Sequence, residues 1–118
     1  MVESTQQEKT MLRQLKIKTG IVNRGVKEHK SYKMEKTQME EKIEKLTKEG
    51  VEEAVLKRYE QDMADTIAML PSLKSKIEEG VDGLEGTIGE AEEAGVVTDE
   101  FKEKEEWKNA AEAIKNAQ

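Results

Sequence analysis

The residues best suited to acid–base chemistry are a single histidine and several pairs of adjacent glutamates. His29 is the only histidine in the sequence, and Ser31 follows two positions later. A nucleophilic serine needs a base within hydrogen-bonding reach, but residues two apart on a helix point in different directions. Pairs such as Glu40–Glu41 have the residue types of catalytic carboxylates, yet on exposed helices such side chains are usually solvated. We therefore predict no catalytic residue and no enzyme activity.

The sequence also lacks the ligand sets of metal and cofactor sites. One histidine is too few for the paired Glu-x-x-His motifs of a di-iron bundle, and no zinc or calcium-loop spacing is present. Glycines recur every third residue from Gly80 to Gly89, but without the Gly-Lys-Ser/Thr ending of a phosphate-binding loop. We expect no metal and no cofactor.

Composition limits the kind of fold that can position any functional side chain. Charged residues make up 39% of the 118 residues, hydrophobic residues 35% and aromatic residues only 3%. Such a composition suits a narrow apolar seam between long helices. No apolar run is long enough to span a membrane, no leader pattern is visible, and cysteine is absent. We expect a soluble, intracellular protein with a single domain over residues 1–118.

Two heptad stripes predict two long helices. The a and d positions of the first stripe are Leu15, Lys18, Val22, Gly25, His29, Tyr32, Lys36, Met39, Ile43 and Leu46. They predict a helix over residues 8–48, which Gly50 ends. The second stripe contains Leu56, Tyr59, Met63, Thr66, Leu70, Leu73 and Ile77, then continues through Val81, Leu84, Ile88 and Ala91. It stays in register across Pro71 and therefore predicts one helix over residues 52–93, kinked at Pro71.

A shorter third helix is predicted over residues 99–116, with Thr98 as its N-cap. Trp107, Ala110, Ile114 and Ala117 share one face, and Phe101 lies just off that face. The fold expected is all-α: an elongated, rod-like, antiparallel three-helix bundle with coiled-coil-like packing. The third helix should cover the end where the first helix begins.

The glycine series at Gly80, Gly83, Gly86 and Gly89 lies inside the second predicted helix. Each glycine costs about 1 kcal/mol relative to alanine in a helix. Close packing against the third helix is one explanation, and a soft, fraying half-helix is the other. The second is favoured because a period of three rotates the glycines around the helix.

The charge is distributed unevenly along the chain. Residues 1–36 hold nine Lys or Arg and four acids, whereas residues 80–118 hold four and eleven. The basic end on an otherwise acidic chain says more about possible partners than the net charge does. Nucleic acid is not expected, because acidic helices lie alongside and no aromatic platform is available for stacking bases. Membrane binding is not expected either, because the apolar residues beside the lysines are needed in the seam.

The stretch "LKIKTGIVNRGVKEHKSY" resembles the first helix of the tubulin-folding cofactor A family, also called tubulin-specific chaperone A. The matching elements are Leu15-Lys16-Ile17-Lys18, Val22-Asn23-Arg24, Val26-Lys27-Glu28 and Tyr32. "EEKIEKL" (residues 40–46) is similar to the end of that helix, and "MLP" (residues 69–71) to the family's kinked second helix. Gly25 departs from a usual leucine, and the tyrosine-aspartate before the second helix is absent.

The resemblance implies a protein that captures β-tubulin after its release from the cytosolic chaperonin, without ATP, before αβ-heterodimer assembly. It also implies a cytoplasmic, cytoskeleton- or microtubule-associated location. A monomer is expected rather than a homodimer.

The alternative function is that of a non-catalytic helical-hairpin or coiled-coil adaptor for an unrelated protein. A general holdase would need larger apolar patches than the sequence indicates.

Because tubulin is acidic, the basic third of the chain is the expected docking edge. The cations would steer the encounter, and two apolar residues off the seam would supply contact area. The predicted partner-binding residues are Lys16, Ile17, Lys18, Arg24, Lys27, Lys30, Lys33 and Met34. The alternative for each lysine is simple solvation of a helix face.

Overall fold

The structure is a computed structural model, and it describes residues 5–118. The described part of the chain contains helices and no strand, which confirms the all-α prediction. The helices are α1 (Gln6–Glu49), α2 (Glu53–Glu93), α3 (Asp99–Lys102) and α4 (Glu105–Asn116). Residues 1–4 of the predicted domain lie outside the described residues. Within the part described, no helix has the length and apolar character needed to cross a membrane.

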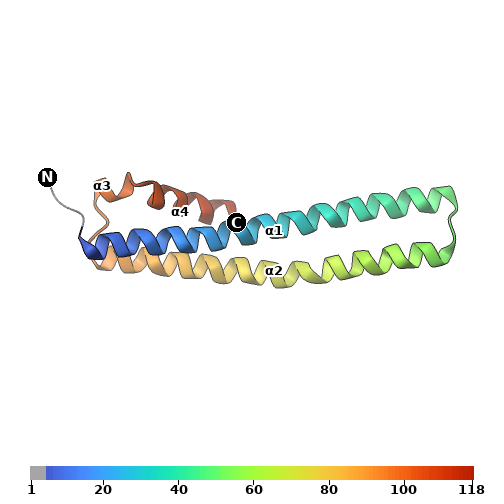
Figure 1. Cartoon of the computed structure of the whole chain (residues 1–118), viewed down its shortest axis with the longest axis horizontal. Helices are drawn as coiled ribbons and strands as arrows, with labels where there is room; N and C mark the ends of the chain where they lie inside the picture. Colours follow the sequence, from blue (N-terminus) through green and yellow to red (C-terminus); the bar gives the residue numbers. More distant parts are fainter. Residues whose placement is uncertain (1–4) are drawn as a thin grey trace. The chain divides into compact units, whose positions relative to one another are not determined.

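The chain divides into two compact units. The terminal unit comprises residues 1–26 and 76–118, and the hairpin unit comprises residues 27–75. The terminal unit holds the first part of α1, the last part of α2, and both short helices, whereas the hairpin unit holds the remainder of α1 and α2 with the turn between them (Figure 1). The single domain, the rod shape and the kink at Pro71 stay predictions.

Glycines end both long helices by the same mechanism. Gly50 and Gly95 have φ angles of 72° and 74°, the left-handed region that a residue with a Cβ rarely adopts. After α1, the Val51 N–H donates to the Leu46 carbonyl at 3.3 Å, and after α2 the Val96 N–H donates to the Ala91 carbonyl at the same distance. These bonds define Schellman motifs. The predicted stop at Gly50 is confirmed.

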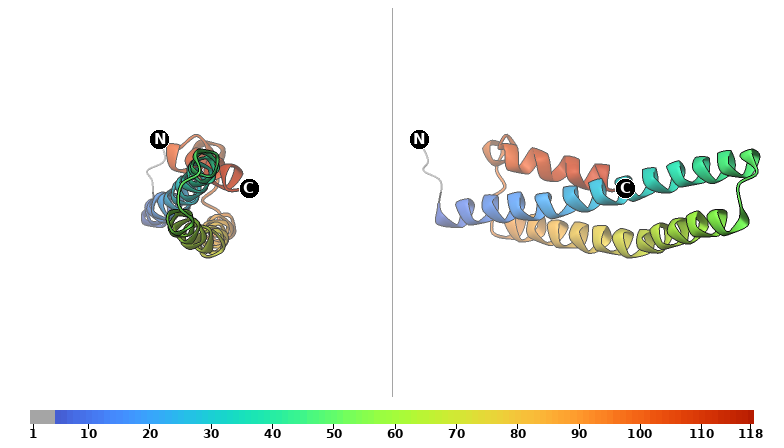
Figure 2. Two further views of the ribbon diagram at one scale, coloured as in Figure 1. Left: turned by 90° about the vertical axis from the view of Figure 1, so that its right-hand side faces the viewer. Right: turned by 45° about the vertical axis from the view of Figure 1, so that its right-hand side comes forward.

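The terminal unit holds a continuous hydrophobic core. In both ribbon diagrams α4 lies alongside the first part of α1, with the end of α2 beside it (Figures 1 and 2). Six fully buried residues form the centre of the core: Leu15, Val22, Leu84, Phe101, Ala110 and Ala113. The two heptad stripes and the third-helix face therefore meet here, as the sequence predicted.

The third predicted helix is wrong in one respect, because two helices replace it. Thr98 caps α3 as predicted, its hydroxyl accepting from the Phe101 N–H at 3.2 Å. α3 ends at Lys102, and Lys104 is extended (φ −66°, ψ 142°) before α4 begins. In one continuous helix Phe101 would lie off the face of Trp107. The break turns Phe101 into the core, where its ring meets that of Trp107 edge to face, with centroids 5.8 Å apart.

The hairpin unit is a two-helix seam with less burial. The seam residues of α1 from His29 to Leu46 are half-buried, and their neighbours on α2 are half-buried or buried. Thr66 and Leu73 are the most enclosed residues of this unit. The Thr66 hydroxyl lies 3.7 Å from the sulfur of Met39, which joins α2 to α1. Two packed helices alone bury little apolar surface, so the stability of this unit depends on its narrow apolar stripe.

The glycine series does not pack against the C-terminal helices. A Cβ at Gly80 would lie 3.3 Å from a methyl carbon of Val22 on α1. At Gly83, Gly86 and Gly89 an added Cβ would meet nothing within 4 Å. Close packing against the third helix is therefore the wrong explanation. The α2 helix continues through the series to Glu93, and fraying stays a prediction.

Candidate partner-binding surface

All eight predicted partner-binding residues lie on α1, divided between the two units. The terminal unit carries Lys16, Ile17, Lys18 and Arg24, and the hairpin unit carries Lys27, Lys30, Lys33 and Met34. Every one of them is exposed except Lys18, which is half-buried. Each unit therefore presents three predicted cations and one apolar side chain.

Ile17 and Arg24 share one face of α1 in the terminal unit, because seven residues are close to two helical turns. Ile17 is 50% exposed. The Arg24 guanidinium extends back along the helix, because a Cβ added at Gly20 would lie 3.4 Å from one of its nitrogens. An exposed apolar side chain and a positive charge therefore share this face of α1.

Ile21, which directly precedes the seam residue Val22 on α1, also belongs to this surface although it is not among the predicted partner-binding residues. It is 46% exposed. The facing position on α2 is Gly80, which has no side chain to cover it; an added Cβ there would lie 3.6 Å from an Ile21 methyl carbon. The exposure of Ile21 therefore follows from the residue that faces it on α2, which only the structure shows.

Lys16 and Lys18, which flank Ile17 in the sequence, lie on different sides of α1. Lys18 turns toward α2, and its ammonium donates to the Gly83 carbonyl oxygen at 3.4 Å. Lys16 lies at a different edge, lining a depression of about 320 Å³ together with Glu105, Glu106 and Asn109 of α4. Those carboxylates offset its charge, so Lys16 is the weakest candidate for recognising an acidic partner.

In the hairpin unit, Lys27 and Met34 also lie seven residues apart and share a face of α1. Met34 is 56% exposed, the largest fraction among the exposed large hydrophobic residues in the described part of the chain. The ion pairs found within residues 5–118 use Lys36, Lys48, Lys57 and Lys108. The six predicted cations are absent from these pairs, and the three in this unit, Lys27, Lys30 and Lys33, are all exposed to a partner.

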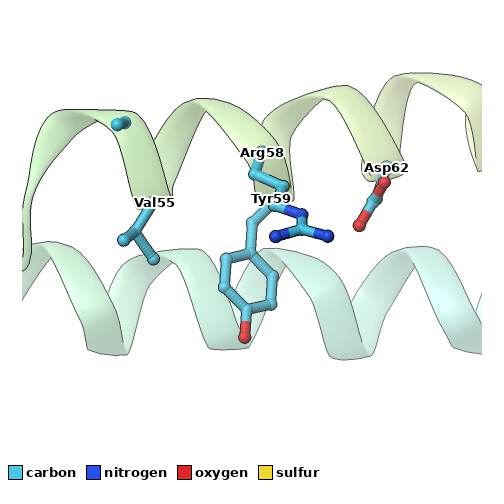
Figure 3. A pocket seen from close by; sticks show the side chains of 5 residues that line it. Val55, Arg58, Tyr59 and Asp62 are labelled. Atoms are coloured by element: carbon cyan, nitrogen blue, oxygen red, sulfur yellow. The ribbon is translucent and has the colours of Figure 1, made fainter.

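A second surface feature of the hairpin unit was missed. A depression of about 460 Å³ lies on α2 and is lined by Ala54, Val55, Arg58, Tyr59 and Asp62. Figure 3 shows Tyr59 pointing toward α1, as its seam position requires, with the Arg58 guanidinium between Tyr59 and Asp62. Val55 is an exposed aliphatic residue at its edge. No heptad signal distinguishes this combination from an ordinary helix surface.

In the described residues, no group of three or more His, Asp or Glu side chains is arranged to hold a metal ion.

Comparison with known proteins identifies the family. The sequence profile described as tubulin binding cofactor A matches residues 10–114. The chain is 36% identical over 92 residues to tubulin-specific chaperone A of Mus musculus, covering 78% of this chain and 84% of that protein. It is 40% identical to the Homo sapiens protein of the same name over 67 residues, covering 57% of this chain and 62% of that protein.

Solved structures agree with the sequence match. Tubulin folding cofactor A from Arabidopsis thaliana superposes with a TM-score of 0.81 at 29% identity, covering 92% of this chain and 95% of that chain. Human tubulin chaperone cofactor a gives a TM-score of 0.70 at 31% identity, covering 89% and 95%. Because the profile spans nearly all of the described residues, this chain belongs to the tubulin binding cofactor A family.

Proposed function

We propose that this chain is a tubulin-folding chaperone that captures β-tubulin released from the cytosolic chaperonin and holds it, without ATP, before αβ-heterodimer assembly. The observation that carries the proposal is the family match over residues 10–114. The relatives named tubulin-specific chaperone A match along most of their own length in mouse and rabbit. The proposed location is the cytoplasm, in association with the microtubule cytoskeleton, and the proposed free form is a monomer.

The surface of α1 supports this proposal physically. Arg24 and Lys27 are exposed cations outside the described ion pairs. Cations in such positions accelerate the encounter with an acidic partner, and nearby aliphatic side chains then add contact area. Ile17 and Met34 are exposed near these charges in their respective units. This combination suits reversible capture of an acidic protein.

Affinity capture from cell extract tests the proposal directly. The tagged chain is expected to recover β-tubulin without α-tubulin, equally in untreated and in nucleotide-depleted extract. Recovery of both tubulins together would contradict capture of the single subunit. Absence of tubulin even at low salt, together with recovery of another protein, would support the adaptor function instead.

Reversing two charges on α1 should slow client binding. In the double variant Arg24→Glu, Lys27→Glu, we expect the association rate with β-tubulin to fall about tenfold at low salt, because electrostatic steering raises such rates by 10- to 1,000-fold. The dissociation rate should change less. Stopped-flow or surface-based kinetics at two ionic strengths would measure both rates, and circular dichroism would check that helicity is retained.

The chain offers a matched control for this experiment. Lys42 and Lys45 have the same spacing, are exposed on α1, and lie 18 residues further along, which is five complete turns. Their reversal changes the net charge by the same amount on the same face of the helix. Equal slowing by both double variants would indicate a general charge effect and reject Arg24 and Lys27 as a docking edge.

A further inference from the structure

We propose that a groove between α1 and α2 in the terminal unit receives an apolar side chain from a client helix that carries acidic residues beside it. The groove, called here the glycine groove, has a volume of about 360 Å³ and is lined by Lys18, Ile21, Lys76, Glu79, Gly80 and Gly83. This inference rests on the proposed function and specifies where on the chain the client docks.

The two glycines give the groove its depth, but packing explains only one of them. Gly80 allows α2 to approach α1, since a Cβ there would be 3.3 Å from Val22. Gly83 has no such neighbour, because its added Cβ would meet nothing within 4 Å. Among the glycines of the series with open space around an added Cβ, Gly83 is the one that lines the groove, and its lack of a side chain lets a partner approach the α2 backbone there. Gly83 is therefore the position at which we place the incoming side chain.

The groove is partly apolar and borders further apolar surface. Ile21 forms one wall and is 46% exposed, and Ile17 is exposed one turn earlier on α1. Single exposed aliphatic residues are common on protein surfaces, but two on adjacent turns beside an open groove form a continuous contact area. An apolar side chain entering above Gly83 would cover Ile21 and remove both from water.

The charges around the groove indicate which residues should lie next to the apolar side chain of the partner. Lys18 and Lys76 line the groove, and Glu79 is the one acid that lines it. The Lys18 ammonium donates to the carbonyl oxygen of Gly83, another lining residue, at 3.4 Å. Arg24 adds positive charge on the exposed face of α1. A partner with acidic residues beside its apolar residue complements this pattern, and a basic partner is disfavoured.

A helix is the form of partner that suits the site. Two packed helices present a groove along their length, and a third helix can place one side chain in it and others along its edges. The proposed occupant is therefore an acidic amphipathic helix of β-tubulin. A second copy of this chain is the other occupant to be distinguished.

Filling the groove at Gly83 tests the inference, with Gly86 as a matched control. Gly86 lies on the same helix, is exposed, has open space around its added Cβ and does not line the groove. Gly83→Leu and Gly86→Leu should both raise the midpoint of urea denaturation, because leucine favours a helix more than glycine does. We expect Gly83→Leu to weaken β-tubulin binding at least tenfold and Gly86→Leu to leave it within twofold of the original chain.

A second pair of variants tests whether positive charge at the groove favours an acidic partner. Lys76 lines the groove, whereas Lys74 is exposed on the same helix and does not line it. Lys76→Glu should weaken binding of β-tubulin at low salt about fivefold, and Lys74→Glu should change it little. Equal effects of the two variants would remove the argument for acidic neighbours.

The readout is the shift of radiolabelled, newly translated β-tubulin on native gels across a concentration series of each variant. No shift with the original chain would overturn the proposed function itself. A shift with the original chain that Gly83→Leu leaves unchanged would overturn the glycine groove alone. Sedimentation of the free chain gives the remaining outcome: a dimer that Gly83→Leu dissociates would assign the groove to a second copy and contradict the client helix.

Discussion

The substitution Phe101→Ala is expected to lower the free energy of unfolding by about 3–5 kcal/mol, the range for removing a buried aromatic side chain. Phe101 is fully buried, and its ring meets the Trp107 ring at an interplanar angle of 72°. The cavity would open where α3 packs against α1 and α2, so we expect the two short helices to detach first. Urea denaturation followed by circular dichroism would measure the loss.

The fluorescence of Trp107 localises this effect, because it is the only tryptophan in the chain. Its emission should shift to longer wavelength in Phe101→Ala before urea is added, and much less in Phe101→Leu, which restores most of the volume. Leu46 is a half-buried residue of the hairpin unit, in a different unit from Trp107. Leu46→Ala is therefore the control and should leave the emission unchanged. An unaltered denaturation midpoint in Phe101→Ala would show that α3 contributes little to stability.

The long helices could be predicted from sequence because burial in a two-helix seam follows a simple period. The residues placed at a and d on α1, from Leu15 to Leu46, are all buried or half-buried, even where they are polar, as at Lys36. A sustained heptad averages over many positions, so one glycine or proline does not obscure it. The stop at Gly50 was recognisable because a positive φ strongly favours one residue type.

The division of the third helix could not be predicted in this way. Residues 103–104 are Glu and Lys, both good helix formers, and neither glycine nor proline marks the break. The break arises from tertiary packing, because it lets Phe101 enter the core while Trp107 also contacts it. Propensity gives no information about such a contact, and an aromatic residue just off the predicted face was the only indication.

The candidate partner-binding surface was partly predictable from the heptad period. Exposure of Ile17 and Met34 follows from their positions off the seam, which periodicity gives directly. Exposure of Ile21 depends on what faces it, and the direction of Lys18 depends on an acceptor 65 residues away in the sequence. Pairing two helices residue by residue needs their register, which the sequence alone did not provide.

Replacing Pro71 with alanine is expected to raise the free energy of unfolding by up to about 3 kcal/mol, the difference between the two residues in a helix interior. The α2 helix continues through Pro71, and the residue is exposed. Proline has no N–H to donate to the carbonyl four residues earlier, that of Ile67, and its ring displaces that carbonyl. Alanine would restore the hydrogen bond and remove the cause of the predicted kink.

Ser72→Ala is the matched control, because it changes the next exposed residue of α2 without involving proline. It should raise stability by only about 0.5 kcal/mol, the difference in helix propensity between serine and alanine. Urea denaturation of both variants separates the backbone effect at position 71 from the general benefit of alanine. If Pro71→Ala instead lowers the free energy of unfolding, the seam between α2 and α1 within the hairpin unit is fitted to a bend at this residue. A proline that costs stability in its own helix would then be retained because the packing of its neighbours depends on it.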